Sequence, residues 1–77
     1  MDKATTKELD KIISSLEENA SALQAIYDDM EAEFGDKSEK WQESEKGEEF
    51  QESMSTLESQ ISSIEDITSE LSGLMER

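Results

Sequence analysis

The sequence predicts an all-α fold: an antiparallel two-helix coiled-coil hairpin that dimerises into a four-helix bundle or forms a higher oligomer. Apolar residues recur in alternating steps of four and three in both halves of the chain, which is the pattern of a coiled-coil seam. Gly35 and Asp36 interrupt that pattern near the middle, and the absence of proline from the 77 residues permits long helices on either side. We therefore expect residues 1–77 to form a single helical-hairpin domain.

The first predicted helix spans about residues 6–34. Thr5 and Glu8 form a T-x-x-E capping box, which indicates a helix start at that point. The apolar seam of this helix consists of Leu9, Ile13, Leu16, Ala20, Leu23, Tyr27, Met30 and Phe34. Gly35 follows the seam directly and is typical of a C′ glycine whose left-handed conformation ends a helix.

The predicted joint covers about residues 35–46 and holds the only tryptophan, Trp41, which does not fit the register of the seam downstream. Asp36 and Ser38 are both candidate N-caps within the joint, and Ser44 with Gly47 makes a second helix start there plausible. Either the register breaks near Gly47, or residues 38–46 form a short helical turn at an angle to the helix that follows. We favour a kinked joint.

The second predicted helix spans about residues 47–75 and nearly matches the first in length, which supports a hairpin. Its apolar seam consists of Phe50, Met54, Leu57, Ile61, Ile64, Thr68, Leu71 and Met75. If the two helices pair antiparallel, Leu9 lies near Leu74 and Phe34 lies near Phe50.

Further apolar residues widen the seam. Ile12 and Ile26 in the first helix, and Ile67 and Leu74 in the second, occupy the g position of the heptad. One partner helix covers the a and d positions but leaves g residues partly exposed to water, so this stripe favours a bundle of more helices. The simplest arrangement is two hairpins related by a two-fold axis. The predicted oligomer interface consists of Ile12, Ile13, Ile26, Ile67, Leu71 and Leu74.

The chain is strongly acidic, with 21 acidic and 7 basic residues and a formal net charge of −14. Such a surface repels nucleic acid and anionic membranes, so we expect no direct binding to either and a partner protein with a basic surface. Regularly spaced carboxylates on a helical rod can also imitate the phosphates of DNA. The alternative interpretation is that the charge only keeps a small coiled coil in solution.

Several residue types needed for catalysis and metal binding are missing. Cysteine and histidine are both absent, which excludes disulfides, thiolate metal sites and the commonest general base. Adjacent acidic residues such as Asp28 and Asp29 point to different sides of a helix, and a rod offers no pocket around them. We therefore expect no enzymatic activity, no catalytic residue, no cofactor and no metal. The lack of cysteine, of a signal peptide and of a long apolar run favours the cytoplasm.

The joint contains the candidate partner- or ligand-binding site. Its residues are Ser38, Lys40, Trp41, Gln42, Ser44 and Lys46. In one interpretation, Trp41 is a plug that closes the end of the core against Phe34 and Phe50. In the other, it is a platform that stacks a nucleobase or anchors a partner, with the lysines pairing with phosphate.

The run SEKWQESEKGEEFQE, which begins at Ser38, contains a near-repeat six residues apart. It resembles a stretch that recurs in small helical proteins of tailed bacteriophages, and the match extends to about Leu57, roughly a quarter of the chain. The resemblance implies a phage-encoded protein that acts in the cytoplasm of the bacterial host. It also implies an anti-defence role, because small acidic phage proteins often inhibit host systems and some oligomeric ones sequester cyclic nucleotide signals.

Three functional hypotheses follow. The leading one is a non-enzymatic, oligomeric binding protein, a phage-encoded inhibitor of a host defence protein with an acidic surface that imitates DNA. The first alternative is a sponge that sequesters a nucleotide immune signal at sites around Ser38–Lys46 of neighbouring subunits. The second alternative is a structural or accessory coiled coil.

Overall fold

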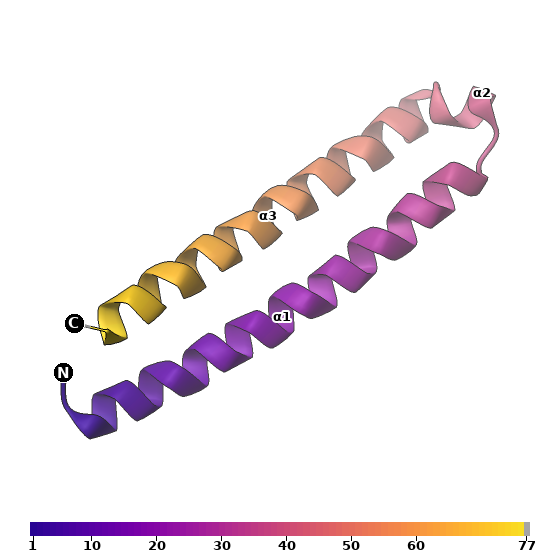
Figure 1. Ribbon diagram of the computed structural model, residues 1–77. Coiled ribbons are helices and arrows are strands. Elements are labelled where there is room, and N and C mark those ends of the chain that lie inside the picture. The colour runs from indigo at the N-terminus through magenta and orange to yellow at the C-terminus, as the bar shows by residue number, and fades with distance from the viewer. Residues whose placement is uncertain (77) are drawn as a thin grey trace.

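The computed structural model describes residues 1–76, which form three helices. These are α1 (Lys3–Asp36), α2 (Glu39–Gln42) and α3 (Glu45–Met75). The two long helices contact each other, and the short α2 packs against α3. The chain turns back on itself at α2, so both termini lie at the other end of the molecule (Figure 1). The all-helical class and the contact between two long helices are thus as the sequence predicts.

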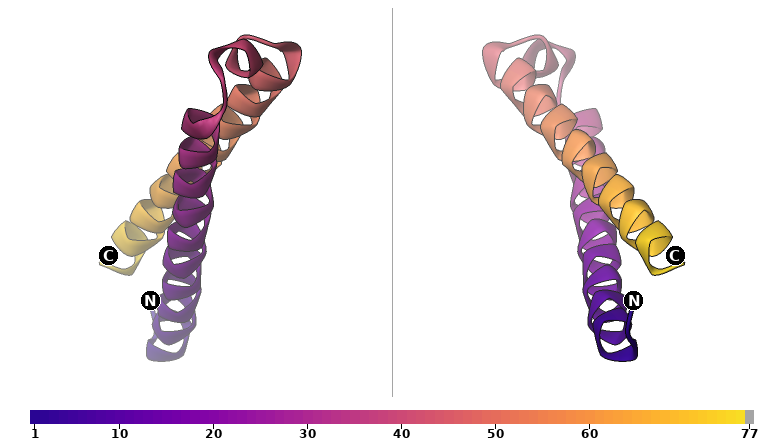
Figure 2. Two further views of the ribbon diagram at one scale, coloured as in Figure 1. Left: turned by 90° about the vertical axis from the view of Figure 1, so that its right-hand side faces the viewer. Right: turned by 90° about the vertical axis from the view of Figure 1, so that its left-hand side faces the viewer.

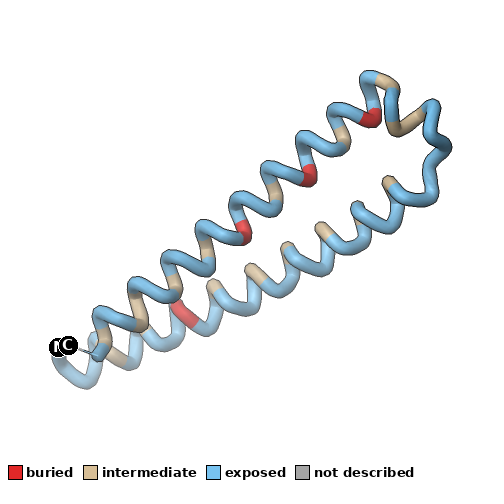
Figure 3. The backbone as a smooth tube through the Cα atoms, turned by 45° about the horizontal axis from the view of Figure 1, so that its top comes forward, coloured by how far each residue is buried: buried red, intermediate tan, exposed pale blue. Residues whose placement is uncertain are grey.

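The molecule is a rod. It measures 58 × 15 × 13 Å and has a radius of gyration of 17.4 Å, whereas a compact chain of this length would have a radius of about 11–12 Å. Side views show that α1 and α3 cross at an angle (Figure 2). Each long helix therefore has one side against its neighbour and its outer side in solvent (Figure 3).

The contact between the long helices follows the predicted seams. All of the predicted a and d residues of both helices are buried or half-buried, while most other positions are exposed. The most buried apolar side chains are Ile13, Met54 and Ile61, which are 5%, 9% and 5% exposed. Buried positions lie on the facing sides of α1 and α3 (Figure 3). The apolar periodicity therefore determines which side of each helix is inside.

The first helix starts earlier than the capping box predicts. Its N-cap is Asp2, whose Oδ1 accepts a hydrogen bond of 2.8 Å from the backbone N–H of Thr5. This hydrogen bond lowers the pKa of the Asp2 carboxyl. A carboxylate at this position also interacts favourably with the positive end of the helix dipole. The prediction of a start at Thr5 or Thr6 is therefore wrong, because Asp2 is a stronger cap upstream of both.

The first helix also continues through Gly35 to Asp36, so the predicted left-handed C′ glycine is wrong. None of residues 1–76 has a positive φ angle. The end of α1 is instead capped by a side chain from the joint, because Gln42 Nε2 donates hydrogen bonds to the carbonyls of Phe34 (3.0 Å) and Lys37 (3.1 Å). A distant amide thus supplies the donors that a glycine turn would otherwise provide.

The joint is kinked, as predicted, and contains the short helix α2. Ser38 is its N-cap, with Oγ accepting a hydrogen bond from the Trp41 N–H at 3.2 Å. The next helix, α3, begins at Glu45, two residues before the predicted start at residue 47. Its N-cap is Ser44, whose Oγ accepts a hydrogen bond from the Gly47 N–H at 3.3 Å. Two serines in the same sequence context therefore start two consecutive helices.

Candidate functional site

Three aromatic side chains close the core at the joint end of the rod. The ring centroids of Phe34 and Phe50 are 5.9 Å apart and the rings are stacked. Trp41 contacts both rings edge-on, at 6.0 Å from Phe34 and 5.8 Å from Phe50. Such offset and edge-to-face arrangements are favourable for aromatic pairs. We call Phe34, Trp41 and Phe50 the aromatic plug, because they are placed as the plug interpretation of Trp41 predicts.

The polar residues of the candidate binding site hydrogen-bond to the backbone around them. Ser38 and Ser44 cap the helices that follow them, and Ser44 Oγ also donates to the Trp41 carbonyl. Gln42 caps the end of α1 through its amide nitrogen. These three side chains therefore have a structural role in the shape of the joint: the cap at Ser38 is as predicted, whereas the sequence pattern did not reveal the role of Gln42.

The lysines of the joint lie at its surface. Lys40 and Lys46, both in the candidate binding site, are exposed. Lys37, which the sequence interpretation did not include, places its Nζ 5.2 Å from the centroid of the Trp41 ring. This distance permits a cation–π interaction, and the sequence carried no signal for it, because Lys37 and Ser38 have extended backbone conformations and a helical spacing does not apply. One face of Trp41 is thus covered by a cation of its own chain.

Gly47 is a second residue whose role the sequence interpretation missed. It is buried, and a Cβ atom built on it would overlap the carbonyl groups of Trp41 and Gln42. The last turn of α2 therefore packs directly against the backbone of the first turn of α3. The available signal was the position of Gly47 on the seam extrapolated back from Phe50, where a glycine indicates close approach of two backbone segments.

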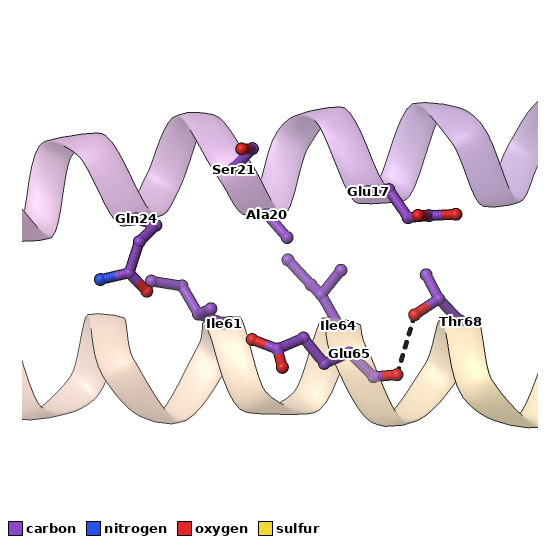
Figure 4. Close-up of a pocket in the computed structure, with 8 residues that line it drawn as sticks. All are labelled: Glu17, Ala20, Ser21, Gln24, Ile61, Ile64, Glu65 and Thr68. Atoms are coloured by element: carbon purple, nitrogen blue, oxygen red, sulfur yellow. Dashed lines mark hydrogen bonds between the residues drawn. The ribbon is translucent and has the colours of Figure 1, made fainter.

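The two flanks of the seam differ in chemistry. In two helices that run in opposite directions, the e positions share one flank and the g positions share the other. Glu17 and Gln24 of α1 line one groove together with Glu65 of α3 (Figure 4). Ser53 and Gln60 of α3 line another groove beside Met30. The e flank, which we call the acidic flank, consists of Asp10, Glu17, Gln24, Glu31, Gln51, Glu58, Glu65 and Ser72.

The eight e positions of the acidic flank, from Asp10 onward in α1 and from Gln51 onward in α3, carry five carboxylates, and the e position one heptad before Asp10 is Lys3 in the first turn of α1. Near the centre of this flank the Tyr27 hydroxyl hydrogen-bonds to the Glu58 carboxylate, and this bond raises the pKa of Tyr27. Partial burial and the neighbouring charges of Glu31 and Asp28 raise it further. Glu17 and Glu65 line the same groove from opposite helices (Figure 4). The flank is therefore a row of negative charge that runs along the rod.

The opposite flank carries the exposed apolar side chains. Ile12, Ile26, Ile67 and Leu74 are 51%, 50%, 47% and 38% exposed. We call the g positions the apolar flank: Ile12, Asn19, Ile26 and Glu33 of α1 with Ser53, Gln60, Ile67 and Leu74 of α3. Of the other predicted interface residues, Leu71 is half-buried and Ile13 is buried in the seam of the single chain.

Within residues 1–76, no group of three or more acidic, histidine or cysteine side chains is arranged to hold a metal ion. In the same range, no buried side-chain nitrogen or oxygen lacks a hydrogen-bond partner. No helix in the described part of the chain is both long enough and apolar enough to cross a membrane. Comparisons of the chain with protein-family models, curated proteins and solved structures find no match.

Proposed function

We propose that this chain is a non-catalytic binding protein: an antiparallel coiled-coil hairpin that self-associates through its apolar flank and binds a basic partner protein through its acidic flank. The observation that carries the proposal is the separation of chemistry between the two flanks of one seam. Carboxylates occupy five of the eight positions on the acidic flank but only one, Glu33, on the apolar flank. A chain that needed charge only for solubility would not require this separation.

The proposed interaction with the partner is electrostatic. A row of carboxylates on a rod raises the local concentration of a positively charged protein and accelerates their association. It can also occupy a groove that otherwise binds phosphates, because both ligands present spaced negative charges. Imitation of DNA is therefore the form of the proposal that we favour. The resemblance of residues 38–57 to phage proteins leads us to propose a bacterial host protein as the partner, inhibited in the cytoplasm.

The test is capture of partners from a bacterial lysate by the tagged chain at several salt concentrations. A variant with Glu17→Gln, Glu31→Gln, Glu58→Gln and Glu65→Gln removes four charges from the acidic flank. A control variant removes four charges elsewhere, with Glu8→Gln, Glu18→Gln, Glu52→Gln and Glu70→Gln. We expect the first variant to lose the partner and the control to retain it. Added double-stranded DNA should displace the chain from the captured protein.

Two results would contradict the proposal. If both variants lose the partner equally, the interaction depends on total charge and not on the acidic flank. If no protein is captured specifically at any salt concentration, the structural or accessory coiled coil becomes the better hypothesis. We do not propose the nucleotide sponge, because Ser38, Gln42 and Ser44 bond to their own backbone and Lys37 covers a face of Trp41.

A further inference from the structure

The hairpin exposes more surface than its mass requires. Its accessible surface is 5890 Å² for 8.7 kDa, whereas a compact monomer of this mass exposes about 4,700 Å². The excess is therefore about 1,200 Å². A stable interface of standard size buries about 800 Å² on each partner, so this excess is sufficient for one such interface.

The residues of the apolar flank form four successive levels along the rod. Phe34 is level with Phe50, with which it stacks, and Ala20 points toward Ile64 two heptads further on (Figure 4). Because each heptad advances both helices by seven residues, these two contacts also determine which residues of the apolar flank lie at the same level. From the termini to the joint, the pairs are Ile12 with Leu74, Asn19 with Ile67, Ile26 with Gln60, and Glu33 with Ser53. Each of the first three levels contains an exposed apolar side chain, and the fourth contains the charged residue.

We propose that a second copy of this chain packs on the apolar flank. The two copies are related by a two-fold axis that is perpendicular to the long axis of the rod and passes near Asn19 and Ile67. This inference rests on the self-association in the proposed function and adds its geometry. The first three levels of the two copies overlap, so Ile12 of each copy lies against Ile26 of the other. Asn19 and Ile67 each meet their own counterpart, and the two joints point in opposite directions.

The position of Glu33 selects this staggered arrangement over a complete overlap of two oppositely directed hairpins. Complete overlap would place the axis between the second and third levels. Glu33 of each copy would then lie on Ile12 and Leu74 of the other, which buries a carboxylate in an apolar contact without a cationic partner. In the staggered arrangement Glu33 instead lies opposite Thr5, an exposed polar residue in the first turn of α1 of the second copy, and it keeps its contact with water.

Charge also argues against two hairpins that point in the same direction. That arrangement would bring the joint ends of both copies together. Asp29, Glu33 and Glu49 are exposed at or beside that end of the apolar flank in each copy, so six carboxylates would gather there against two lysines, the Lys46 of each copy at the next g position of α3. Like charges at short distance repel, and each chain already carries a net charge of −14. The staggered arrangement instead places the two acidic joint ends at opposite ends of a longer rod.

The position of Asn19 on the axis is consistent with this arrangement. A polar side chain that meets its own counterpart inside an otherwise apolar contact fixes the register of associating helices, because a shifted register leaves its hydrogen-bonding groups unsatisfied. A two-fold contact uses the same surface of both copies and therefore closes at two. Both acidic flanks remain outside this dimer, where they are free to bind a partner.

Disulfide cross-linking of single-cysteine variants tests the arrangement, because the chain has no native cysteine. The Cα atoms of two residues must come within about 7 Å to form a disulfide. We expect Asn19→Cys to form a disulfide-linked dimer under mild oxidation. A mixture of Ile12→Cys and Ile26→Cys chains should form mainly the mixed dimer. Gln24→Cys, at an exposed position of the acidic flank, is the matched control and should not cross-link at the same concentration.

Every other result overturns the inference in an identifiable way. A cross-link between Asn19→Cys and Ile26→Cys indicates complete overlap, and a cross-link between Ile12→Cys and Leu74→Cys indicates hairpins that point in the same direction. Either cross-link would still show that the chain self-associates. If light scattering shows a monomer of 8.7 kDa, self-association itself fails, whereas partner capture through the acidic flank is tested independently.

Discussion

The two ends of the rod differ in how their apolar and polar groups are covered. At the joint end, three aromatic rings, two serine caps and the Gln42 amide satisfy apolar and polar groups within one chain. Toward the terminal end, Ile12, Ile67 and Leu74 remain 51%, 47% and 38% exposed. The same heptad pattern runs through both ends, so the seam alone does not account for the difference. The joint end folds around its own residues. The apolar side chains at the terminal end are uncovered in the single chain, and we propose that a second copy covers them.

The largest expected effect on stability is at the joint end. Trp41→Ala removes the half-buried ring that contacts both phenylalanines of the aromatic plug. Because large-to-small substitutions lose buried apolar area and leave a cavity, we expect a loss of about 2–4 kcal/mol in the free energy of unfolding. Circular dichroism during urea denaturation measures it. Lys40→Ala, at an exposed neighbouring position, should cost much less, and equal losses for both would show that the ring does not close the core.

The next effect is at the terminal end, where assembly should change more than folding. Ile67→Asn places a polar side chain at the proposed two-fold axis. We expect the dimer to dissociate about 10- to 100-fold more readily, because the contact loses two apolar side chains at once. Sedimentation equilibrium measures this change, with Ser62→Asn on the exposed outer side of α3 as the control. Unchanged dissociation for Ile67→Asn would show that a second copy does not cover this position.

Two glycines of α3 should respond to alanine in opposite directions. Gly47→Ala forces a methyl group against the carbonyls of Trp41 and Gln42, so we expect a loss of about 1–3 kcal/mol. Gly73→Ala meets no atom within 4 Å and removes a flexible residue from a helix, so we expect a gain of about 0.5–1 kcal/mol. Thermal unfolding of both variants compares them. A gain for Gly47→Ala would contradict the close contact between α2 and α3.

A smaller effect is expected from the side chain that caps the end of α1. Gln42→Glu keeps the size of the side chain but removes the N–H groups that bond to the Phe34 and Lys37 carbonyls. We expect a loss of about 1–2 kcal/mol in the free energy of unfolding, since the Lys37 carbonyl loses the Gln42 donor and the Phe34 carbonyl keeps only the backbone N–H of Lys37. Gln51→Glu introduces the same charge at an exposed position and is the control. Equal stabilities of the two variants in denaturant would contradict the cap.

The smallest effect is a pH dependence on the acidic flank. Glu58 raises the pKa of Tyr27 in the folded chain, so the folded state retains the phenolic proton more strongly than the unfolded state does. Stability from this pair is therefore constant below the ordinary tyrosine pKa of about 10 and falls as pH rises above it. Glu58→Gln should bring the pKa of Tyr27 closer to its ordinary value. Because the chain has one tyrosine, ultraviolet absorbance during titration measures this directly.

The sequence was sufficient for features that repeat and insufficient for features that depend on a single distant contact. The seams from Leu9 to Phe34 and from Phe50 to Met75 were predictable, because burial of one helix side requires apolar residues at a regular spacing. The end of α1 was not predictable from Gly35, because the cap comes from Gln42, which is brought close only by the turn of the chain.

The candidate site shows the same limit. Trp41 was identified as unusual because it lies off the seam, and the structure places it against Phe34 and Phe50. Ser38 and Ser44 were predicted both as binding residues and as candidates to start a helix, because serine is suited to either role, and the geometry shows that they cap α2 and α3. The g residues were assigned from their heptad position, but their placement on one flank depends on how the chain turns back at α2 (Figure 1).

The central claim is that the terminal end of this rod is completed by a second copy. The most direct test is the mass of the full chain by sedimentation equilibrium across micromolar concentrations. We predict a mass of twice 8.7 kDa that converts to the monomer mass only on dilution. A mass of 8.7 kDa throughout that range would contradict the claim, and a mass that keeps rising with concentration would contradict the closed two-fold contact.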